Sequence, residues 1–306
     1  MRFHFDADQE HQRKAIDGVV EALEGALLDN GPVNCGDVPA SLFSAARSRS
    51  LDPDALLENV RRVQRRNELS PDEALRTLSA TVSGQEVVIP NLSVEMETGT
   101  GKTYVYLRSA FELHRRFDLN AFVVVVPSIA VREGVMKTIE ATSEHFRDLF
   151  GGPVVNAWAY DGGRIGRLRS FGGPGRIDIM VVTLDAFNKA SNVMRQARDQ
   201  ARGIEPIRFI QATRPVVILD EPQNMESDIS REAIALLAPL VVLRFSATHR
   251  DPYNLLYRLS PATAYREGLV KRVEIAEVVE EGQLDRPFIR VLDVAAGKRS
   301  ITAKLE

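Results

Sequence analysis

The chain has 306 residues, of which 44% are hydrophobic, so it is long enough and apolar enough to fold around one large core or two smaller ones. Its 39 basic and 42 acidic residues give a formal net charge of −3, which excludes a strong overall attraction to nucleic acid and limits any such contact to a local surface. The single cysteine, Cys35, excludes an internal disulfide and fits a reducing cytoplasm, and no apolar run reaches the roughly 20 residues of a membrane span. We therefore expect a cytoplasmic protein without a membrane partner.

The first part of the chain predicts helices. Apolar residues recur with a helical period over residues 9–28, which predicts a helix that ends near Gly31 and Pro32. Residues 53–66 and 71–78 have similar patterns, so we interpret 31–90 as a variable helical insertion. The basic run at 61–66 is interpreted as a solvent-exposed helix face, with a phosphate-binding patch as the alternative.

From residue 92 the sequence alternates short apolar runs with longer helical periods. The runs predict strands at 92–96, 121–126, 154–158, 177–182, 216–219 and 241–245, and the segments between them predict helices at 104–117, 129–150, 184–202 and 229–237. Unbroken aliphatic runs such as 122–126 are typical of strands that are buried on both faces. The sequence therefore predicts an α/β fold with a mostly parallel sheet and helices on both of its faces.

The stretch from Val94 to Thr103 predicts a nucleotide site, because a strand there breaks into a glycine-containing turn and then into a helix. The turn Thr98-Gly99-Thr100-Gly101 has no bulky side chain, so its backbone N–H groups can point at phosphate oxygens, and the helix adds the positive end of its dipole. Lys102 supplies a charge for the outer phosphates, and Thr103 supplies a hydroxyl for a magnesium ion.

A second signal follows the strand at 216–219, where Asp220 and Glu221 place two carboxylates together. Asp220 can hold magnesium opposite Thr103, while Glu221 can orient and deprotonate an attacking water molecule. A pair of acids after a strand can also be a plain cap, but the phosphate loop upstream favours ATP hydrolysis. Polar groups also follow three other strands, at Pro127–Ser128, Thr183 and 246–249. Since ligands of parallel sheets bind at the carboxyl ends of the strands, these residues predict a single active edge.

Two other segments have distinct compositions. Residues 161–176 are rich in glycine and arginine and predict a loop, which we interpret as solvated, with DNA-backbone binding as the alternative. The apolar–polar alternation at 271–279 and 288–294, and a turn at 295–298 before 300–305, predict a short antiparallel β tail.

Three motifs, at 98–103, 220–223 and 246–249, together resemble motifs I, II and III of superfamily 2 helicases and translocases. More narrowly, residues 91–99, 126–135 and 185–189 resemble the Res (restriction) subunit of type III restriction-modification enzymes, and the resemblance covers 9–28 and about 88–306. It implies that residues 1–270 form an N-terminal RecA-like ATP-binding domain and that 271–306 begin a further, β-rich domain.

The resemblance also implies roles for individual residues. Gln12 falls where such enzymes recognise adenine, although a glutamine on a helix face is the plain alternative. Contacts to the backbone of double-stranded DNA are implied for Pro127, Ser128, Arg132 and Thr183. Coupling of the nucleotide state to the grip on DNA is implied for Gln223, Ser246, Thr248 and His249.

Further partners follow from the same resemblance. It implies a modification (methyltransferase) subunit, a second motor domain that carries arginine fingers, and a C-terminal nuclease domain, and neither domain can be assigned in this sequence. We therefore expect residues 1–306 to bind ATP and Mg²⁺ but to hydrolyse ATP slowly. Two alternatives stay open: a stand-alone superfamily 2 helicase without a nuclease, and a non-catalytic nucleotide- or DNA-binding module.

Overall fold

The computed structural model describes residues 5–32, 47–82, 85–160, 165–185, 205–270, 291–296 and 301–305. Contacts within the chain divide it into two compact units, Met1–Val270 and Lys271–Glu306. In the second unit, β11 (Val291–Ala296) pairs antiparallel with β12 (Ile301–Leu305), so the antiparallel tail is confirmed there. The strand predicted at 271–279 and Cys35 lie outside the described residues.

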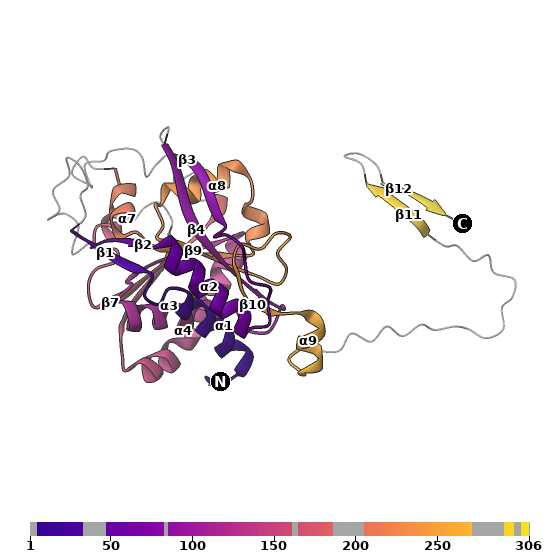
Figure 1. The fold of residues 1–306 in the computed structure, drawn as a ribbon, viewed down its shortest axis with the longest axis horizontal. Coiled ribbons are helices and arrows are strands. Elements are labelled where there is room, and N and C mark those ends of the chain that lie inside the picture. The colour runs from indigo at the N-terminus through magenta and orange to yellow at the C-terminus, as the bar shows by residue number, and fades with distance from the viewer. Residues whose placement is uncertain are drawn as a thin grey trace, which may run out of the picture. The chain divides into compact units, whose positions relative to one another are not determined.

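A central sheet organises the first unit, and its described part has eight strands (Figure 1). Neighbours along the sheet are, in order, β10 (Leu255–Leu259), β4 (Gln85–Met96), β9 (Val241–Ser246), β8 (Val216–Asp220), β5 (Ala121–Val126), β7 (Arg176–Thr183) and β6 (Val154–Ala159). All of these pairings are parallel. β3 (Thr77–Val82) pairs antiparallel with the first half of β4.

Alternate side chains of β5 show how the sheet is covered. Phe122, Val124 and Val126 are buried in one apolar core. That core is completed by α1 (Glu10–Ala22), α2 (Pro53–Arg66), α3 (Lys102–Phe117) and α4 (Ile129–Phe150). Val123 and Val125 are buried in a second core on the other face, with α7 (Ile207–Thr213) and α8 (Asp228–Leu236). The prediction of a mostly parallel sheet with helices on both faces is confirmed.

Capping residues explain why several predicted helices begin where they do. The Ser128 side chain accepts a hydrogen bond from Val131 N at the start of α4, and Asp52 accepts from Asp54 N and Ala55 N at the start of α2. These bonds satisfy N–H groups that a helix terminus otherwise leaves unpaired. α4 ends at Gly151, whose positive φ of 73° suits a helix C-terminus. None of the helices in the described ranges combines the length and the apolarity of a membrane-crossing segment.

The prediction for residues 9–28 was too long. α1 ends at Ala22, Gly25 turns the chain with a φ of +70°, and β1 (Leu27–Pro32) pairs with β2 (Arg47–Leu51). Backbone pairing between distant segments, which a helical period cannot reveal, decides the structure of residues 27–32.

Residues 71–78 do not form the predicted helix. Residues 77–82 are strand β3, which packs against α8 (Figure 1). β3 also pairs with residues 85–90 of β4, the part of that strand that extends beyond its parallel pairing with β9 and β10. The region 31–90 is therefore only partly helical, and its α2 packs on α1 and β10 in the first core. The predicted helix at 184–202 lies almost entirely outside the described residues.

The glycine- and arginine-rich segment is more ordered than a solvated loop, in the part that the structure describes. A short helix, α5 (Ile165–Leu168), buries Leu168, and Phe171 is buried after it. The fully buried carboxylate of Asp178 accepts hydrogen bonds from Gly172 N at 2.7 Å and Arg176 Nε at 3.0 Å. Burial of Leu168 and Phe171, and the ion pair of Arg176 with the buried Asp178, thus fix a segment whose composition alone predicted a solvated loop.

The basic run on α2 is satisfied within the chain. Arg61 donates to the carbonyl oxygens of Asp72 and Glu73 at 2.9 and 2.7 Å, and Arg66 pairs with Glu21. These contacts support the interpretation of an ordinary helix face over that of a phosphate-binding patch.

Candidate nucleotide site

Five strands that are followed by predicted site residues lie next to one another in the sheet. β4, β9, β8, β5 and β7 are consecutive in the sheet and parallel, so their carboxyl ends share one edge. The phosphate loop follows β4, the acids follow β8, and Ser246 ends β9. The predicted strand ends therefore lie on one edge of the sheet, and its activity stays a prediction. In the sheet, β9 and β8 lie between β4 and β5, although both come after these strands in the sequence.

The phosphate loop connects β4 to α3, and its glycines have backbone conformations that other residues rarely adopt. Gly99 has a φ of +85° and Gly101 a φ of +95°. A Cβ atom on Gly101 would lie 2.5 Å from Gln12 Nε2 and displace that side chain, and the positive φ already disfavours any residue other than glycine. Thr100 Oγ1 donates to the carbonyl oxygen of Glu97 at 2.6 Å and closes the turn. The N-terminus of α3 follows at Lys102, as an anion site of this kind requires.

Gln12 reaches the loop from α1. Its side-chain Nε2 donates to the carbonyl oxygen of Thr100 at 3.1 Å, and His11 Nε2 lies at the same distance from that oxygen. Gln12 is buried against the loop, and its role in recognising adenine stays a prediction. A cleft of about 460 Å³ opens here, lined by Gln12, the loop glycines, Phe5 and Tyr104. Its size and its position beside the loop suit the base and sugar of a nucleotide.

Lys102 joins the loop to the acidic strand end. Its Nζ lies 3.1 Å from Glu221 Oε1 and donates to the carbonyl oxygen of Met96 at 3.3 Å. Its side chain is 11% exposed, so this ion pair is largely shielded from solvent. The ammonium therefore lies between the phosphate loop and the predicted catalytic acid.

Glu221 is the centre of a hydrogen-bond network that also includes β9. Its carboxylate accepts hydrogen bonds from Gln223 Nε2 and Ser246 Oγ, both at 2.9 Å. Burial acts to raise the pKa of Glu221, but the bond from Gln223 and the charge of Lys102 outweigh it and hold that pKa below its usual value. Glu221 has a φ of +56°, an unfavourable conformation for a residue with a side chain, as is common at functional sites. It is an ionised acceptor, as a base that orients water must be.

Asp220 has a different environment from its neighbour. Burial, and then the negative charge of Glu221, raises the pKa of Asp220 to about 6. The hydroxyl of Tyr106 donates to Asp220 Oδ2 at 3.4 Å. Asp220 and Thr103 offer hard oxygen atoms, which are the ligands that Mg²⁺ prefers when phosphate oxygens complete its shell. The donor set therefore fits a magnesium ion held between the loop and β8.

Glu95 is a buried acid that sequence reasoning missed. Its carboxylate accepts a hydrogen bond from His249 N at 3.0 Å and pairs with Arg258 Nε from β10. Burial opposes its charge, but these contacts with His249 and Arg258 prevail and lower the pKa of Glu95 to about 2. A charged residue in the buried strand Asn91–Met96 was the available signal. Glu95 ties the strand before the phosphate loop to the segment after β9.

A family model described as "Type III restriction enzyme, res subunit" matches residues 8–251. The chain belongs to this family. The match spans the phosphate loop, the acids after β8 and the segment after β9, so the predicted resemblance to Res subunits is confirmed, and with it the RecA-like α/β class.

The curated relatives of this Res-family chain are longer than the part of them that it matches. The StyLTI Res subunit of Salmonella typhimurium is 32% identical over 222 residues, which are 60% of the chain and 22% of that protein. The EcoP15I Res subunit of Escherichia coli is 23% identical over 301 residues, which are 89% of the chain and 29% of that protein. A solved structure of a nuclease-deletion mutant of the type ISP restriction-modification enzyme LlaGI in complex with a DNA substrate mimic is 14% identical, with a TM-score of 0.39, and covers 58% of this chain and 18% of that one.

The residues predicted to couple nucleotide and DNA lie together in this Res-family chain. Ser246 Oγ lies 3.0 Å from Gln223 Oε1 and accepts from Thr248 N at 3.2 Å, so these three residues form one group with Glu221. His249 lines the same pocket as Gln223 and Thr248, and its backbone N–H donates to Glu95. Their coupling role stays a prediction.

The residues predicted to contact DNA lie at two neighbouring strand ends. Ser128 is exposed at the start of α4, and Arg132 on the same helix pairs with Glu133 at 2.9 Å. Thr183 ends β7 directly opposite Val126 of β5 and is 4% exposed. Pro127 follows Val126 at the end of β5, which is the strand next to β8, and the roles of all four residues stay predictions.

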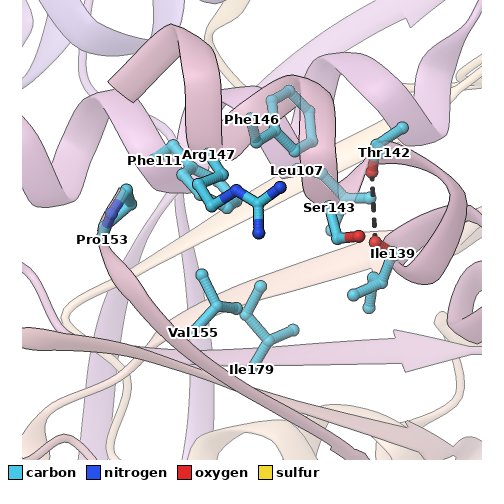
Figure 2. A pocket seen from close by; sticks show the side chains of 10 residues that line it. All are labelled: Leu107, Phe111, Ile139, Thr142, Ser143, Phe146, Arg147, Pro153, Val155 and Ile179. Atoms are coloured by element: carbon cyan, nitrogen blue, oxygen red, sulfur yellow. Dashed lines mark hydrogen bonds between the residues drawn. The ribbon is translucent and has the colours of Figure 1, made fainter. Parts of the chain in front are cut away.

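A separate apolar cavity of about 230 Å³ lies between α3, α4 and the start of β6 (Figure 2). Figure 2 shows the guanidinium group of Arg147 above the aliphatic side chains of Val155 and Ile179. Val155 belongs to the amino end of its strand, so this cavity lies away from the carboxyl edge that carries the phosphate loop. Its lining contains none of the predicted site residues.

Proposed function

We propose that this Res-family chain is an ATP- and Mg²⁺-binding motor domain that hydrolyses ATP and contacts the backbone of double-stranded DNA. One observation carries the proposal: Lys102 of the phosphate loop and Glu221 of the acidic pair meet with their charged atoms 3.1 Å apart. A phosphate cradle, a cation, a metal-binding carboxylate and a water-orienting base are the parts that phosphoryl transfer requires.

Each part has a defined task. Backbone N–H groups of the loop and the N-terminus of α3 bind the phosphates, and Lys102 balances their charge. Thr103 and Asp220 hold Mg²⁺, which neutralises charge on the phosphate oxygens when it is bound. Glu221 is ionised because its pKa is lowered, so it can orient the attacking water and accept its proton.

The neighbouring strand ends provide a route from nucleotide to DNA. Glu221 accepts hydrogen bonds from Gln223 and Ser246, so a shift of Glu221 reaches the segment after β9. Pro127, Ser128, Arg132 and Thr183 lie on the same sheet edge and would contact DNA phosphates and sugars, which gives binding without sequence preference.

The complete enzyme of the proposal is larger than this chain. The relatives are named Res subunits of type III restriction-modification enzymes, and the chain spans only 22% and 29% of their lengths. We include in the proposal a second motor domain, a nuclease domain and a modification (methyltransferase) subunit. Residues 1–306 by themselves should hydrolyse ATP slowly, because the arginine fingers belong to the proposed second motor domain. An arginine finger accelerates phosphoryl transfer by about 10³ to 10⁵ in related reactions. Rapid DNA-stimulated turnover by purified residues 1–306 contradicts that part of the proposal.

The test of the phosphate loop is Lys102→Ala. Loss of the partly buried cation should weaken ATP binding in the presence of Mg²⁺ by about tenfold or more, since charge-assisted contacts are worth roughly 1.5–3 kcal/mol. Calorimetric titration of the chain with ATP measures the change. Lys137→Ala, which removes an exposed lysine from α4, is the matched control and should bind like the unaltered chain. Unchanged affinity in Lys102→Ala rules out the phosphate-loop assignment.

A further inference from the structure

Tyr106 is a fully buried tyrosine beside the proposed magnesium site. It lies one helical turn after Thr103 on α3, so the two side chains share one face of that helix. Its ring packs edge-on against Phe245 of β9, with ring centroids 5.6 Å apart. Its hydroxyl donates to Asp220 Oδ2 on β8 at 3.4 Å.

Simple core packing does not account for the Tyr106 hydroxyl. Burying a hydroxyl costs free energy unless it is hydrogen-bonded, and a phenylalanine would fill the same space against Phe245. The hydroxyl contacts Asp220, which supplies an oxygen ligand of the proposed metal, and Tyr106 lies one helical turn after Thr103, which supplies the other. The Asp220 carboxylate is therefore contacted by one buried group whose ring is fixed by Phe245.

We propose that Tyr106 is a positioning residue that holds the Asp220 carboxylate in place to receive Mg²⁺. This inference rests on the proposed nucleotide and metal site. Tyr106 acts through Asp220 and does not itself bind the metal. Without the hydroxyl, the Asp220 carboxylate is free to turn about its side-chain torsion, so a bound ion has to immobilise it. The affinity for Mg²⁺–ATP then falls, while the affinity for metal-free ATP does not.

The experiment compares Tyr106→Phe with the unaltered chain of 306 residues. ATP is titrated in a calorimeter once with Mg²⁺ and once with EDTA, and the ratio of the two affinities measures the gain that the metal provides. We expect Tyr106→Phe to reduce this ratio about tenfold, as loss of one hydrogen bond to a charged group does. The affinity in EDTA should stay the same, because the phosphate loop is unchanged. Tyr257→Phe removes another buried tyrosine hydroxyl, on β10, and should leave both affinities unaltered.

Manganese provides a second readout. Titration of Mn²⁺ in the presence of ATP, followed by electron paramagnetic resonance, should show about tenfold weaker Mn²⁺ binding in Tyr106→Phe, because one carboxylate ligand is no longer held. Equal metal gains in Tyr106→Phe and the unaltered chain overturn the inference. So does an equal loss of ATP affinity with Mg²⁺ and with EDTA, because that result assigns the hydroxyl to the fold alone.

Failure of the proposed function is distinguishable from failure of this inference. If the unaltered chain gains nothing from Mg²⁺, both the metal site and the role of Tyr106 are wrong. If Lys102→Ala keeps full ATP affinity, the phosphate loop itself is wrongly assigned. If Lys102→Ala loses ATP while Tyr106→Phe keeps the full metal gain, the nucleotide site stands and only Tyr106 is misassigned.

Discussion

Asp220→Asn should raise the free energy of unfolding while it removes the carboxylate that is proposed to hold Mg²⁺. Burial beside Glu221 raises the pKa of Asp220 from 3.8 to about 6. Each pKa unit corresponds to about 1.4 kcal/mol, so the ionised carboxylate costs the native state roughly 3 kcal/mol at pH 8. Asparagine has nearly the same shape and carries no charge, so the variant avoids this cost.

The pH dependence has a definite sign. The native state binds the Asp220 proton more tightly than the unfolded chain does, so the contribution of this residue to stability falls as the pH rises from about 4 to about 6. Above pH 6 the cost is constant, and near pH 5 it is about half as large. The stabilising effect of Asp220→Asn should therefore be largest at pH 8 and shrink in acid.

Urea unfolding in EDTA at pH 8 and at pH 5 measures the difference in the free energy of unfolding between Asp220→Asn and the unaltered chain. Asp148→Asn, at an exposed position of α4, is the matched control and should differ little between the two pH values. If the variant is no more stable than the unaltered chain at pH 8, or if its gain in the free energy of unfolding is equal at both pH values, burial does not destabilise the ionised Asp220 carboxylate and the reasoning is refuted.

Two further substitutions test the acids around the loop. Glu95→Gln should lower the free energy of unfolding at pH 7 by about 2–3 kcal/mol, because the pKa of about 2 reflects a charge that His249 and Arg258 stabilise. That stabilisation is lost as the pH falls from 4.5 towards 2, so urea unfolding at pH 3 should show a smaller difference between the variant and the unaltered chain. An equal loss of stability at both pH values contradicts the prediction. Glu221→Gln should bind ATP several-fold more tightly in calorimetry and release no phosphate, because it removes the carboxylate that competes for Lys102; weaker ATP binding contradicts this.

Local patterns predicted the central elements well. The strand at 121–126 and the helix at 129–150 agree with β5 and α4 at every residue, because unbroken aliphatic runs and the Ser128 cap are local signals. The strands β1 and β3 form by pairing with other segments of the chain, β2 and β4, which a local pattern does not reveal. Both regions were therefore predicted to be helical.

The parts of the site that were missed depend on which strands are neighbours. Tyr106 contacts Asp220 only because α3 lies over β8 and β9, and an apolar period along α3 treats a tyrosine simply as core. Glu95 contacts His249 and Arg258 because β4 lies between β9 and β10. Chain order brings neither pair together, although a charged residue within a buried strand needs a partner.

The pairing of Lys102 with Glu221 has a mechanical consequence for a motor. The same ammonium lies 3.1 Å from Glu221 and beside the proposed phosphate loop, so in the proposed function bound phosphate would compete with the Glu221 carboxylate for it. We expect Glu221 then to keep its hydrogen bonds from Gln223 and Ser246 while it loses its contact with Lys102. Because Ser246 also accepts a hydrogen bond from Thr248 N, the exchange of one ion pair would change the restraints on the next strand end. In the proposed function, coupling of nucleotide to the rest of the sheet edge would therefore begin with the exchange of Glu221 for phosphate at Lys102.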